Sequence, residues 1–448
     1  MMNALNILPS YTDYFTLTTT TLSLNTASVW VGGIVSGFVA GAFCDRAGRK
    51  WTMCWSSALC IIGAIIQTAA QNIGMFVAAR VIIGFGAGVA AVGAASYLAE
   101  TVALTWRPFV LGFYWDAWFI GASISAGITY GTKDILNTWA WRAPSLIQIL
   151  PAMLCIESPR WLAYKDRKDD ALEVLAVAHA WGDTTDPMVV AEYREITETL
   201  EFEKIAGSVS ALETIRTPGN RKRVMICISV GIFSMTMGNN IVTYYFGTMP
   251  NQAGVTDFNT QLKVNIILSA WALVCALAGT MFADKLGRRM LCLVSTASAT
   301  VFLFLTGGFS NLYGDGANVS GSYATVAMMF LFMGCYSFGW TPLTMLYPVE
   351  VLNYSTRATG MGMYMFWANG IGLLVTFAFP YSFEAIGWKT YMFNATFNAL
   401  TILYIWYFWV ETRGKTLEEI DVLIEGVKHA DVPDLMDVIK GKAVVDSV

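Results

Sequence analysis

Charged side chains are scarce in this sequence. Asp, Glu, Lys and Arg make up 13% of its 448 residues, whereas soluble domains contain about 25%. Histidine occurs twice, at positions 179 and 429, outside every apolar run, which excludes a histidine proton relay across a membrane. The net charge of −4 leaves no basic face for nucleic acid. These shortages indicate a membrane protein that does not bind nucleic acid.

Cysteine spacing typical of disulfide frameworks or metal sites is also lacking. The eight cysteines lie in or beside apolar runs and show no paired spacing outside them. We interpret them as small buried apolar residues. No metal or other cofactor is expected. No apolar run pairs a nucleophile with a base, which disfavours an enzyme and leaves no catalytic residue to name.

Long apolar runs are what the sequence has in abundance. A helix needs about 20 apolar residues to cross a bilayer, and the runs do not alternate over about ten residues as barrel strands would. We predict an all-α polytopic membrane protein. Its spans are expected at residues 26–44, 51–71, 75–98, 109–131, 223–247, 263–283, 290–308, 323–349, 358–381 and 388–410, with a shorter run at 143–156.

The connectors between these runs differ in charge. Lysine and arginine crowd alternate connectors, beginning with residues 46–50, whereas 72–74, 248–262 and 309–322 carry almost none. The positive-inside rule therefore places the basic connectors in the cytoplasm. We expect a multi-pass protein of the plasma membrane.

Three charged patterns occur twice, in the same order. "CDRAGRK" (44–50) returns as "ADKLGRR" (283–289), 239 positions later. Each copy is followed by a Glu with an Arg seven positions further on, and each half ends in a Glu/Arg pair, in "ESPRW" and "ETRGK". A single basic connector would be ordinary positive-inside retention, but the ordered set indicates an internal duplication. We predict that these charges form a cytoplasmic gate: Asp45, Arg49, Glu100, Arg107, Glu157, Arg160, Asp284, Arg288, Glu350, Arg357, Glu411 and Arg413.

The duplication predicts four regions. Residues 1–156 are an N-terminal bundle, 157–222 a cytoplasmic helical domain, 223–410 a C-terminal six-helix bundle, and 411–448 a cytoplasmic tail. Within the second region, an amphipathic helix is expected to turn Leu162, Leu172, Val174 and Leu175 inward and to end before Pro187. A charge-rich solvated linker is the alternative.

The motifs together resemble the sugar porter family of the major facilitator superfamily, over the whole chain. Besides the two connectors, the resemblance rests on "ARVIIGFGAG" (79–88), "GNNIVTYY" (238–245), "GWTPLTMLYPVE" (339–350) and "VETRGKTLEEID" (410–421). It is strongest to fungal lactose-permease-like and hexose transporters. The resemblance implies twelve helices in two pseudo-symmetric bundles, alternating access, a mono- or disaccharide substrate, and either proton symport or facilitated diffusion.

The sequence departs from the family pattern in two places. One span, 26–44, precedes the first connector, whereas 223–247 and 263–283 both precede the second. Residues 3–15 look like the outer loop that follows a first helix. The run 143–156 is about 21 Å long at about 1.5 Å per residue, too short for a hydrocarbon core of about 30 Å. We therefore expect about eleven helices, with a first helix missing and the sixth shortened.

Amide and aromatic side chains in the later spans are the candidate sugar ligands, because sugars present both hydroxyls and C–H faces. The span 223–247 offers Asn239, Asn240, Tyr244 and Tyr245, and the resemblance adds Trp340, Trp367 and Asn369. The alternative is that intramembrane Asn and Tyr only hold helices together. Which sugar is carried stays open.

Two charges within spans are candidates for proton coupling, because each is costly in lipid. Arg80 matches a family arginine that faces an aspartate on the first helix of proton-coupled members. Asp116 lies nine residues beyond Arg107, roughly 13 Å into the membrane. A neutral, hydrogen-bonded Asp at a helix interface is an equal alternative.

A sugar transporter is therefore the leading interpretation, with the sugar, protons and the bilayer as its partners and a monomer as its state. A sugar sensor on the same fold is the second interpretation, although the stretch after residue 410 is short for a sensor's cytoplasmic extension. A non-transporting truncated product is the third.

Overall fold

The structure, a computed structural model, is mostly helical in the part of the chain it describes. That part comprises residues 5–6, 8–15, 18–102, 106–135, 137–148, 168–179, 182–184, 189, 193, 218–244, 258–313, 318–352, 354–413 and 424.

Eight of the described helices are long and apolar enough to span a membrane. They confirm the predicted all-α membrane architecture. They are α3 (Thr19–Ala47), α4 (Arg49–Thr68), α5 (Ile73–Thr101), α6 (Arg107–Thr132), α15 (Phe258–Leu286), α16 (Arg288–Tyr313), α17 (Val319–Val351) and α18 (Tyr354–Ile386). A further apolar helix, α19 (Lys389–Phe408), covers the last predicted span.

Two predicted spans differ from expectation. The run 223–247 is not one helix: α12 (Pro218–Thr236) ends in mid-span, and α13 (Asn239–Tyr244) follows after a two-residue break. Of the short run 143–156, α7 (Trp139–Ile147) covers the first part, and residues from 149 onward lie outside the described ones.

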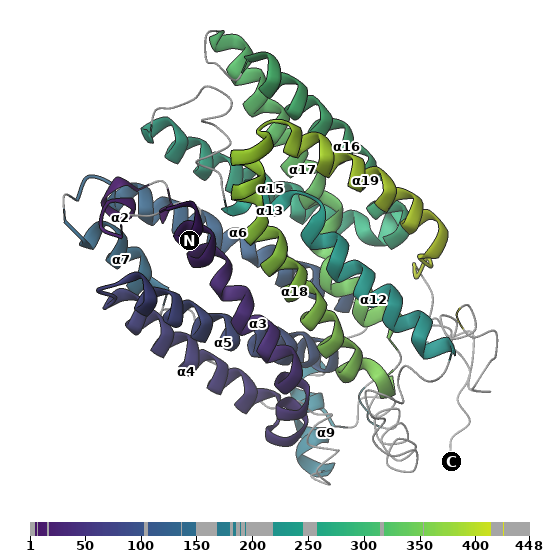
Figure 1. Ribbon diagram of the computed structural model, residues 1–448. Coiled ribbons are helices and arrows are strands. Elements are labelled where there is room, and N and C mark those ends of the chain that lie inside the picture. The colour runs from purple at the N-terminus through teal and green to yellow at the C-terminus, as the bar shows by residue number, and fades with distance from the viewer. Residues whose placement is uncertain are drawn as a thin grey trace.

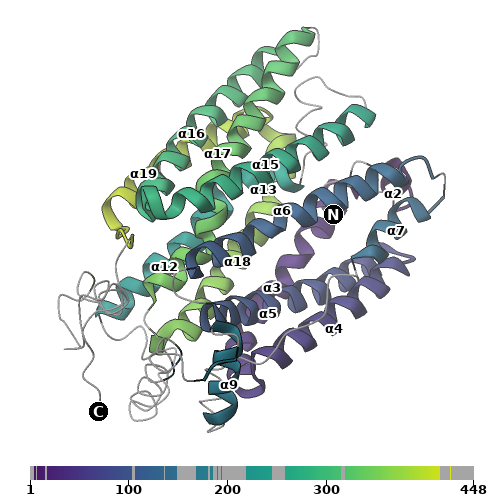
Figure 2. The same ribbon diagram turned by 180° about the vertical axis from the view of Figure 1, so that it is seen from behind.

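The helices form two bundles that lie side by side (Figures 1 and 2). In the N-terminal bundle α5 packs between α3 and α4, and α7 packs on α4 and α6. In the C-terminal bundle α17 packs on α15 and α16, α16 packs on α19, and α12 packs on α18. The bundles meet mainly where α3 lies along α18 and where α6 lies along α15 and α17.

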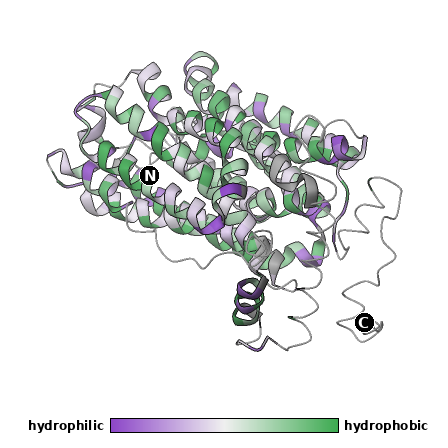
Figure 3. Cartoon of the chain, turned by 90° about the horizontal axis from the view of Figure 1, so that it is seen from below, coloured by the Kyte–Doolittle hydropathy of each residue, from purple (hydrophilic) through white to green (hydrophobic). Residues whose placement is uncertain are grey.

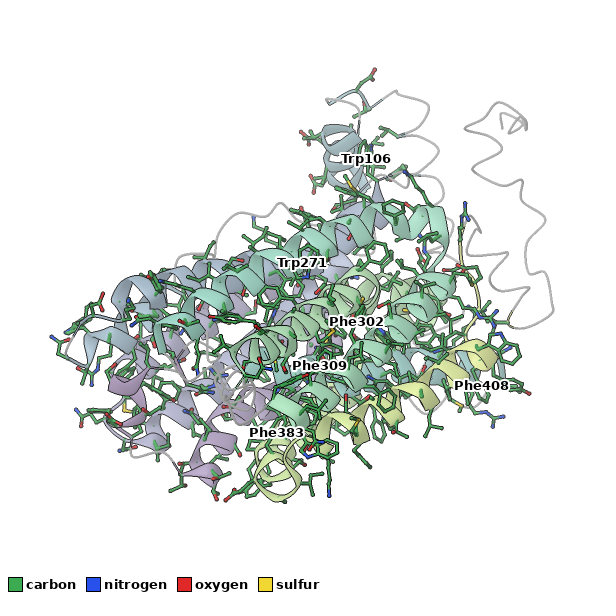
Figure 4. The ribbon with its side chains drawn as sticks, turned by 90° about the horizontal axis from the view of Figure 1, so that it is seen from above. Trp106, Trp271, Phe302, Phe309, Phe383 and Phe408 are labelled. Atoms are coloured by element: carbon green, nitrogen blue, oxygen red, sulfur yellow. The ribbon has the colours of Figure 1, made fainter. Side chains whose placement is uncertain are left out.

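Large apolar side chains are exposed on both bundles, as contact with a bilayer allows, and the ribbon coloured by hydropathy shows hydrophobic residues along the helices of both bundles (Figure 3). Examples are the exposed Phe38 of α3, Val274 of α15 and Phe393 of α19. Side chains also fill the space between the helices, as around Trp271 of α15 (Figure 4), whose indole N–H donates to the Phe330 carbonyl at 2.9 Å.

The two repeated connectors have the same geometry. Gly48 and Gly287 hold φ at 90° and 92°, a region that residues with a Cβ rarely adopt. In each, the arginine after the glycine reaches back to the carbonyl five residues earlier, Arg49 to Cys44 and Arg288 to Ala283, both at 3.4 Å. The duplication read from the sequence is therefore present in the backbone and in its hydrogen bonds.

The N-terminal segment packs on the N-terminal bundle. Its short helix α2 (Pro9–Thr12) contacts α7. Aromatic rings gather around the fully buried Trp141 of α7, at centroid distances of 5.4 to 6.1 Å. They belong to Tyr11, Tyr14, Phe15 and Phe76. The segment predicted to be an outer loop is thus anchored by a core of its own.

A small separate core surrounds α9 (Lys168–His179), which stands apart from both bundles (Figure 3). Ala171, Leu175 and Ala176 are buried against Val189. Leu172 and Val174 pack on this core as partly buried residues. This agrees with the predicted amphipathic helix, while Leu162 lies outside the described residues. The cytoplasmic helical domain as a whole stays a prediction.

Candidate functional site

The second copy of the charged pattern forms one connected cluster at the end of the C-terminal bundle. The guanidinium of Arg288 donates two hydrogen bonds to the carboxylate of Glu350, at 2.7 and 3.0 Å. Its third nitrogen lies 2.7 Å from Asp284. Thr412 donates to the same Glu350 carboxylate at 2.7 Å. Three helices and the chain after α19 are held together by these bonds.

Glu411 completes the cluster at the N-terminal end of α16. Its carboxylate accepts hydrogen bonds from the backbone N–H groups of Arg288 and Arg289, at 2.8 and 3.1 Å. A carboxylate is favoured there because the first N–H groups of a helix lack partners within the helix and carry partial positive charge. A Cβ on Gly287 would come within 2.6 Å of this carboxylate. The glycine is thus required both for its φ and for space.

The first copy is described less completely. Arg49 keeps its place after Gly48, while the side chains of Asp45, Glu100 and Arg107 and all of Glu157 and Arg160 lie outside the described parts of the chain. The Arg357 side chain does too. The exposed Arg413 takes part through its backbone N–H, which donates to Glu411 at 3.1 Å. The ion pairs that the described residues of the charged pattern form all lie within the C-terminal bundle, so a role in holding the two bundles together stays a prediction.

The break between α12 and α13 places two candidate sugar ligands at the start of α13. Asn240 is buried, and its amide N–H donates to the carbonyl of Met235 at 3.0 Å. The side-chain oxygen of Asn239 is buried and has no hydrogen-bond partner among the described residues. The Tyr244 side chain and Tyr245 lie outside the described residues.

The other candidate ligands lie in different surroundings. Trp340 is fully buried, donates to the Thr296 hydroxyl at 3.0 Å and packs edge-to-face on Trp409. Trp340 thus points into the C-terminal bundle. Trp367 on α18 is 43% exposed. Asn369 faces α3, because a Cβ on Gly33 would come within 2.3 Å of its side-chain oxygen, so Asn369 lies between the bundles.

Asp116 lies at the other contact between the bundles. It is fully buried on α6, and the hydroxyl of Thr280 on α15 donates to one of its carboxylate oxygens at 2.5 Å. Gly112, one turn away, admits this approach, because a Cβ there would lie 2.8 Å from the Thr280 methyl group. The second carboxylate oxygen has no hydrogen-bond partner within the described structure.

Arg80 is buried in a different place, beside Tyr11. Tyr11 accepts a hydrogen bond from Asn25. Burial raises the pKa of Tyr11, and the Asn25 hydrogen bond and the charge of Arg80 act in the opposite direction. The two candidates for proton coupling therefore belong to separate sites, as their positions along the chain predict.

Four residues in these sites were not singled out from the sequence. They are Thr280, which bonds Asp116, and Gly238, Asn394 and Asn398, which surround the break between α12 and α13. A positive φ of 99° at Gly238 is invisible in the sequence. The amide side chains within a predicted span were the available signal for Asn394 and Asn398.

Comparison with known proteins identifies the family. Residues 3–424 match the family model described as sugar (and other) transporter. The chain belongs to the sugar porter family of the major facilitator superfamily. This sugar porter is 30% identical over 426 residues to an MFS glucose transporter of Aspergillus flavus, covering 87% of this chain and 78% of the relative. It is 28% identical over 436 residues to the high-affinity glucose transporter of Kluyveromyces lactis, covering 92% and 79%.

Solved structures show the same fold. The sugar porter superposes with a TM-score of 0.81 on the proton:xylose symporter XylE bound to 6-bromo-6-deoxy-D-glucose, at 20% identity and over 95% of both chains. With the inward-open conformation of XylE from E. coli the TM-score is 0.73, at 20% identity and over 95% and 96% of the chains. The two-bundle major facilitator fold is thus confirmed.

Proposed function

We propose that this sugar porter carries a mono- or disaccharide across a membrane by alternating access, with protons as the coupling ion. The observation that carries the proposal is the arrangement of two bundles that contact each other mainly along α3/α18 and α6/α15. Rocking about such contacts exposes a central site first to one side and then to the other. Relatives named as glucose transporters and a symporter named for xylose support a sugar as the substrate.

We place the sugar site at the broken span and the facing helices. Asn239 offers a buried, unpartnered amide oxygen among the described residues, and such an oxygen accepts a hydrogen bond from a sugar hydroxyl. Trp367 offers an exposed ring on α18, a helix that α13 contacts. The proposed set is Asn239, Asn240, Tyr244, Tyr245, Trp340, Trp367 and Asn369.

We assign the charged connectors to a cytoplasmic gate. In the C-terminal bundle, Arg288 joins Asp284 and Glu350 in a compact cluster with little water access, since the Arg288 side chain is 5% exposed. Removing one partner of such a buried pair destabilises a protein more than removing one partner of an exposed pair. In the proposal, the engaged clusters hold the cytoplasmic side closed, and their separation lets it open.

For proton coupling we favour Asp116 over Arg80. Asp116 forms its hydrogen bond across the contact between the bundles, and within the described structure it has no ion-pair partner. Among charged residues on the helices around α6, Asp284 and Glu350 pair with Arg288, and Arg80 lies beside Tyr11. Binding and release of a proton at Asp116 would thus change a bond at a contact about which the bundles rock.

Uptake measurements test the function. The chain is expressed in cells that lack sugar carriers, and labelled glucose, galactose, lactose and cellobiose are offered with and without a protonophore. Saturable uptake of at least one sugar, reduced by the protonophore, is expected. Sugar binding without uptake would instead identify a sensor, and neither binding nor uptake would contradict the proposal. Fractionation and detergent-solution mass would test the plasma-membrane location and the monomer.

A further inference from the structure

Three asparagine side chains surround the break between α12 and α13. In a continuous helix, each carbonyl accepts from the N–H four residues later. At this break, asparagine amides take the place of those N–H groups. Asn240 donates to Met235 at 3.0 Å, Asn394 to Thr236 at 2.8 Å, and Asn398 to Met237 at 2.9 Å. Three consecutive carbonyls are therefore satisfied by side chains.

Two of these side chains come from α19, the last helix of the C-terminal bundle, and lie 158 and 161 positions from the carbonyls they bind. Asn394 and Asn398 are four residues apart and so lie on the same face of that helix. Asn398 is fully buried and Asn394 is 7% exposed. An unsatisfied carbonyl is costly inside a membrane, where no water can replace the missing donor. The break is thus stable at this place because α19 supplies donors there.

The backbone at the break fits these two side chains closely. Gly238 has a φ of 99°, which favours glycine. A Cβ at Gly238 would lie 2.6 Å from the Asn394 side-chain oxygen. The α19 asparagines therefore bind the backbone where α12 ends, and the chain passes close to Asn394 at Gly238, before α13 begins.

The direction of α13 follows from this break. Its first two residues are Asn239 and Asn240, and the helix rests on α17 and α18. If the break shifted by one residue, Asn239 would rotate by about 100° around the helix axis, since a turn has about 3.6 residues. Its unpartnered oxygen would then face elsewhere.

We propose that Asn394 and Asn398 are positioning residues for the sugar site. Through their amide N–H groups they hold the α12–α13 break so that Asn239 presents its amide oxygen to a sugar hydroxyl. Their own side-chain oxygens, like that of Asn239, are buried without a hydrogen-bond partner among the described residues. The inference rests on the proposed sugar transport. It differs from simple helix-to-helix adhesion because both amides bind backbone carbonyls at a helix break rather than another regular helix face.

The test uses purified full-length chain in liposomes and measures exchange of labelled sugar. The variants are Asn398→Leu, Asn394→Leu and the double variant, with Thr401→Val as the matched control. Thr401 is buried on the same helix, but its hydroxyl donates within α19, to Phe397. The sugar is the best substrate from the uptake panel.

The asparagine variants are expected to raise the KM for exchange about tenfold, equivalent to about 1.4 kcal/mol, with the maximal rate changed less than threefold. Thr401→Val should leave both unchanged. Hydrogen–deuterium exchange of the amides in 239–244 should speed up in the asparagine variants and not in the control. This second readout does not require transport.

The outcomes separate the two proposals. If the unmodified chain exchanges no sugar, the proposed function fails. Faster hydrogen–deuterium exchange at 239–244 in Asn398→Leu would still show, without any transport measurement, that α19 holds the break. If amide exchange at 239–244 is unchanged in the asparagine variants, the positioning role is overturned. It is also overturned if KM stays unchanged, or if Thr401→Val raises KM equally.

Discussion

Replacing Asp116 by asparagine separates the proton-binding capacity of this position from its shape. Asparagine keeps an oxygen where the Thr280 hydroxyl donates, at 2.5 Å in the native protein. It cannot bind or release a proton within the physiological pH range. Sugar exchange should therefore continue, and its dependence on pH should disappear.

The size of the effect follows from the bond. A hydrogen bond to a charged group contributes about 1.5–3 kcal/mol, and a neutral one about 0.5–1.5 kcal/mol. Both partners are buried, Asp116 fully and Thr280 to 4% exposure, so water does not weaken the bond. Neutralising Asp116 thus changes the contact between the bundles by about 1–1.5 kcal/mol, or roughly tenfold in an equilibrium constant.

The assay is sugar exchange in liposomes at several pH values, with equal pH on both sides. A second variant, Thr280→Val, removes the hydroxyl that donates to Asp116. Its matched control is Thr129→Val, because Thr129 is buried on the same helix as Asp116 and its hydroxyl donates within that helix, to Ser125. Asp134→Asn controls for loss of an exposed carboxylate. If exchange by Asp116→Asn keeps the pH dependence of the native protein, Asp116 is not the coupling group.

Three further predictions concern the cluster, the connectors and the N-terminal segment. Glu350→Gln and Arg107→Ala should each lower transport with surface expression kept, because each removes a partner from a charge cluster; unchanged uptake in both would remove the gate assignment. Gly287→Ala should cost about 1–2 kcal/mol or more through its positive φ and abolish transport, whereas Gly308→Ala, a helical glycine with open space around it, should be neutral in a thermal-unfolding assay. Trp141→Ala should destabilise the protein by about 3–5 kcal/mol, read as a lowered unfolding temperature; an unchanged temperature would show that the aromatic cluster is dispensable.

Apolar length was enough to predict most of the fold. The run 26–44 lies within α3, the run 323–349 lies within α17, and α4 covers the run 51–71 except for its last three residues. Lipid requires each run to satisfy its own backbone hydrogen bonds, which a helix does. The turns at Gly48 and Gly287 could also be predicted, since a repeated glycine between charged residues indicates a tight turn. The helix ends were less predictable: α12 begins at Pro218, upstream of the apolar run, because proline suits the first turn of a helix.

The break after Thr236 could not be predicted from its own run. That stretch is apolar enough to continue as a helix, and the groups that make a break tolerable are on α19, 158 positions away in the case of Asn394. Thr280 was missed for a related reason. Threonine is common in spans and usually bonds within its own helix, so its bond to Asp116 depends on how the bundles meet.

The bond between Glu411 and the start of α16 also has a consequence for the order in which the protein is made. Arg288 leaves the ribosome 123 residues before the carboxylate that caps its helix, and 62 residues before the one that neutralises its side chain. Throughout synthesis of α17, α18 and α19, the first N–H groups of α16 lack the Glu411 carboxylate, although the Arg288 side chain can pair with Asp284 at once and with Glu350 from the end of α17. The cluster closes when the residues after α19 emerge, so the last bonds of the C-terminal bundle form on completion of its last helix.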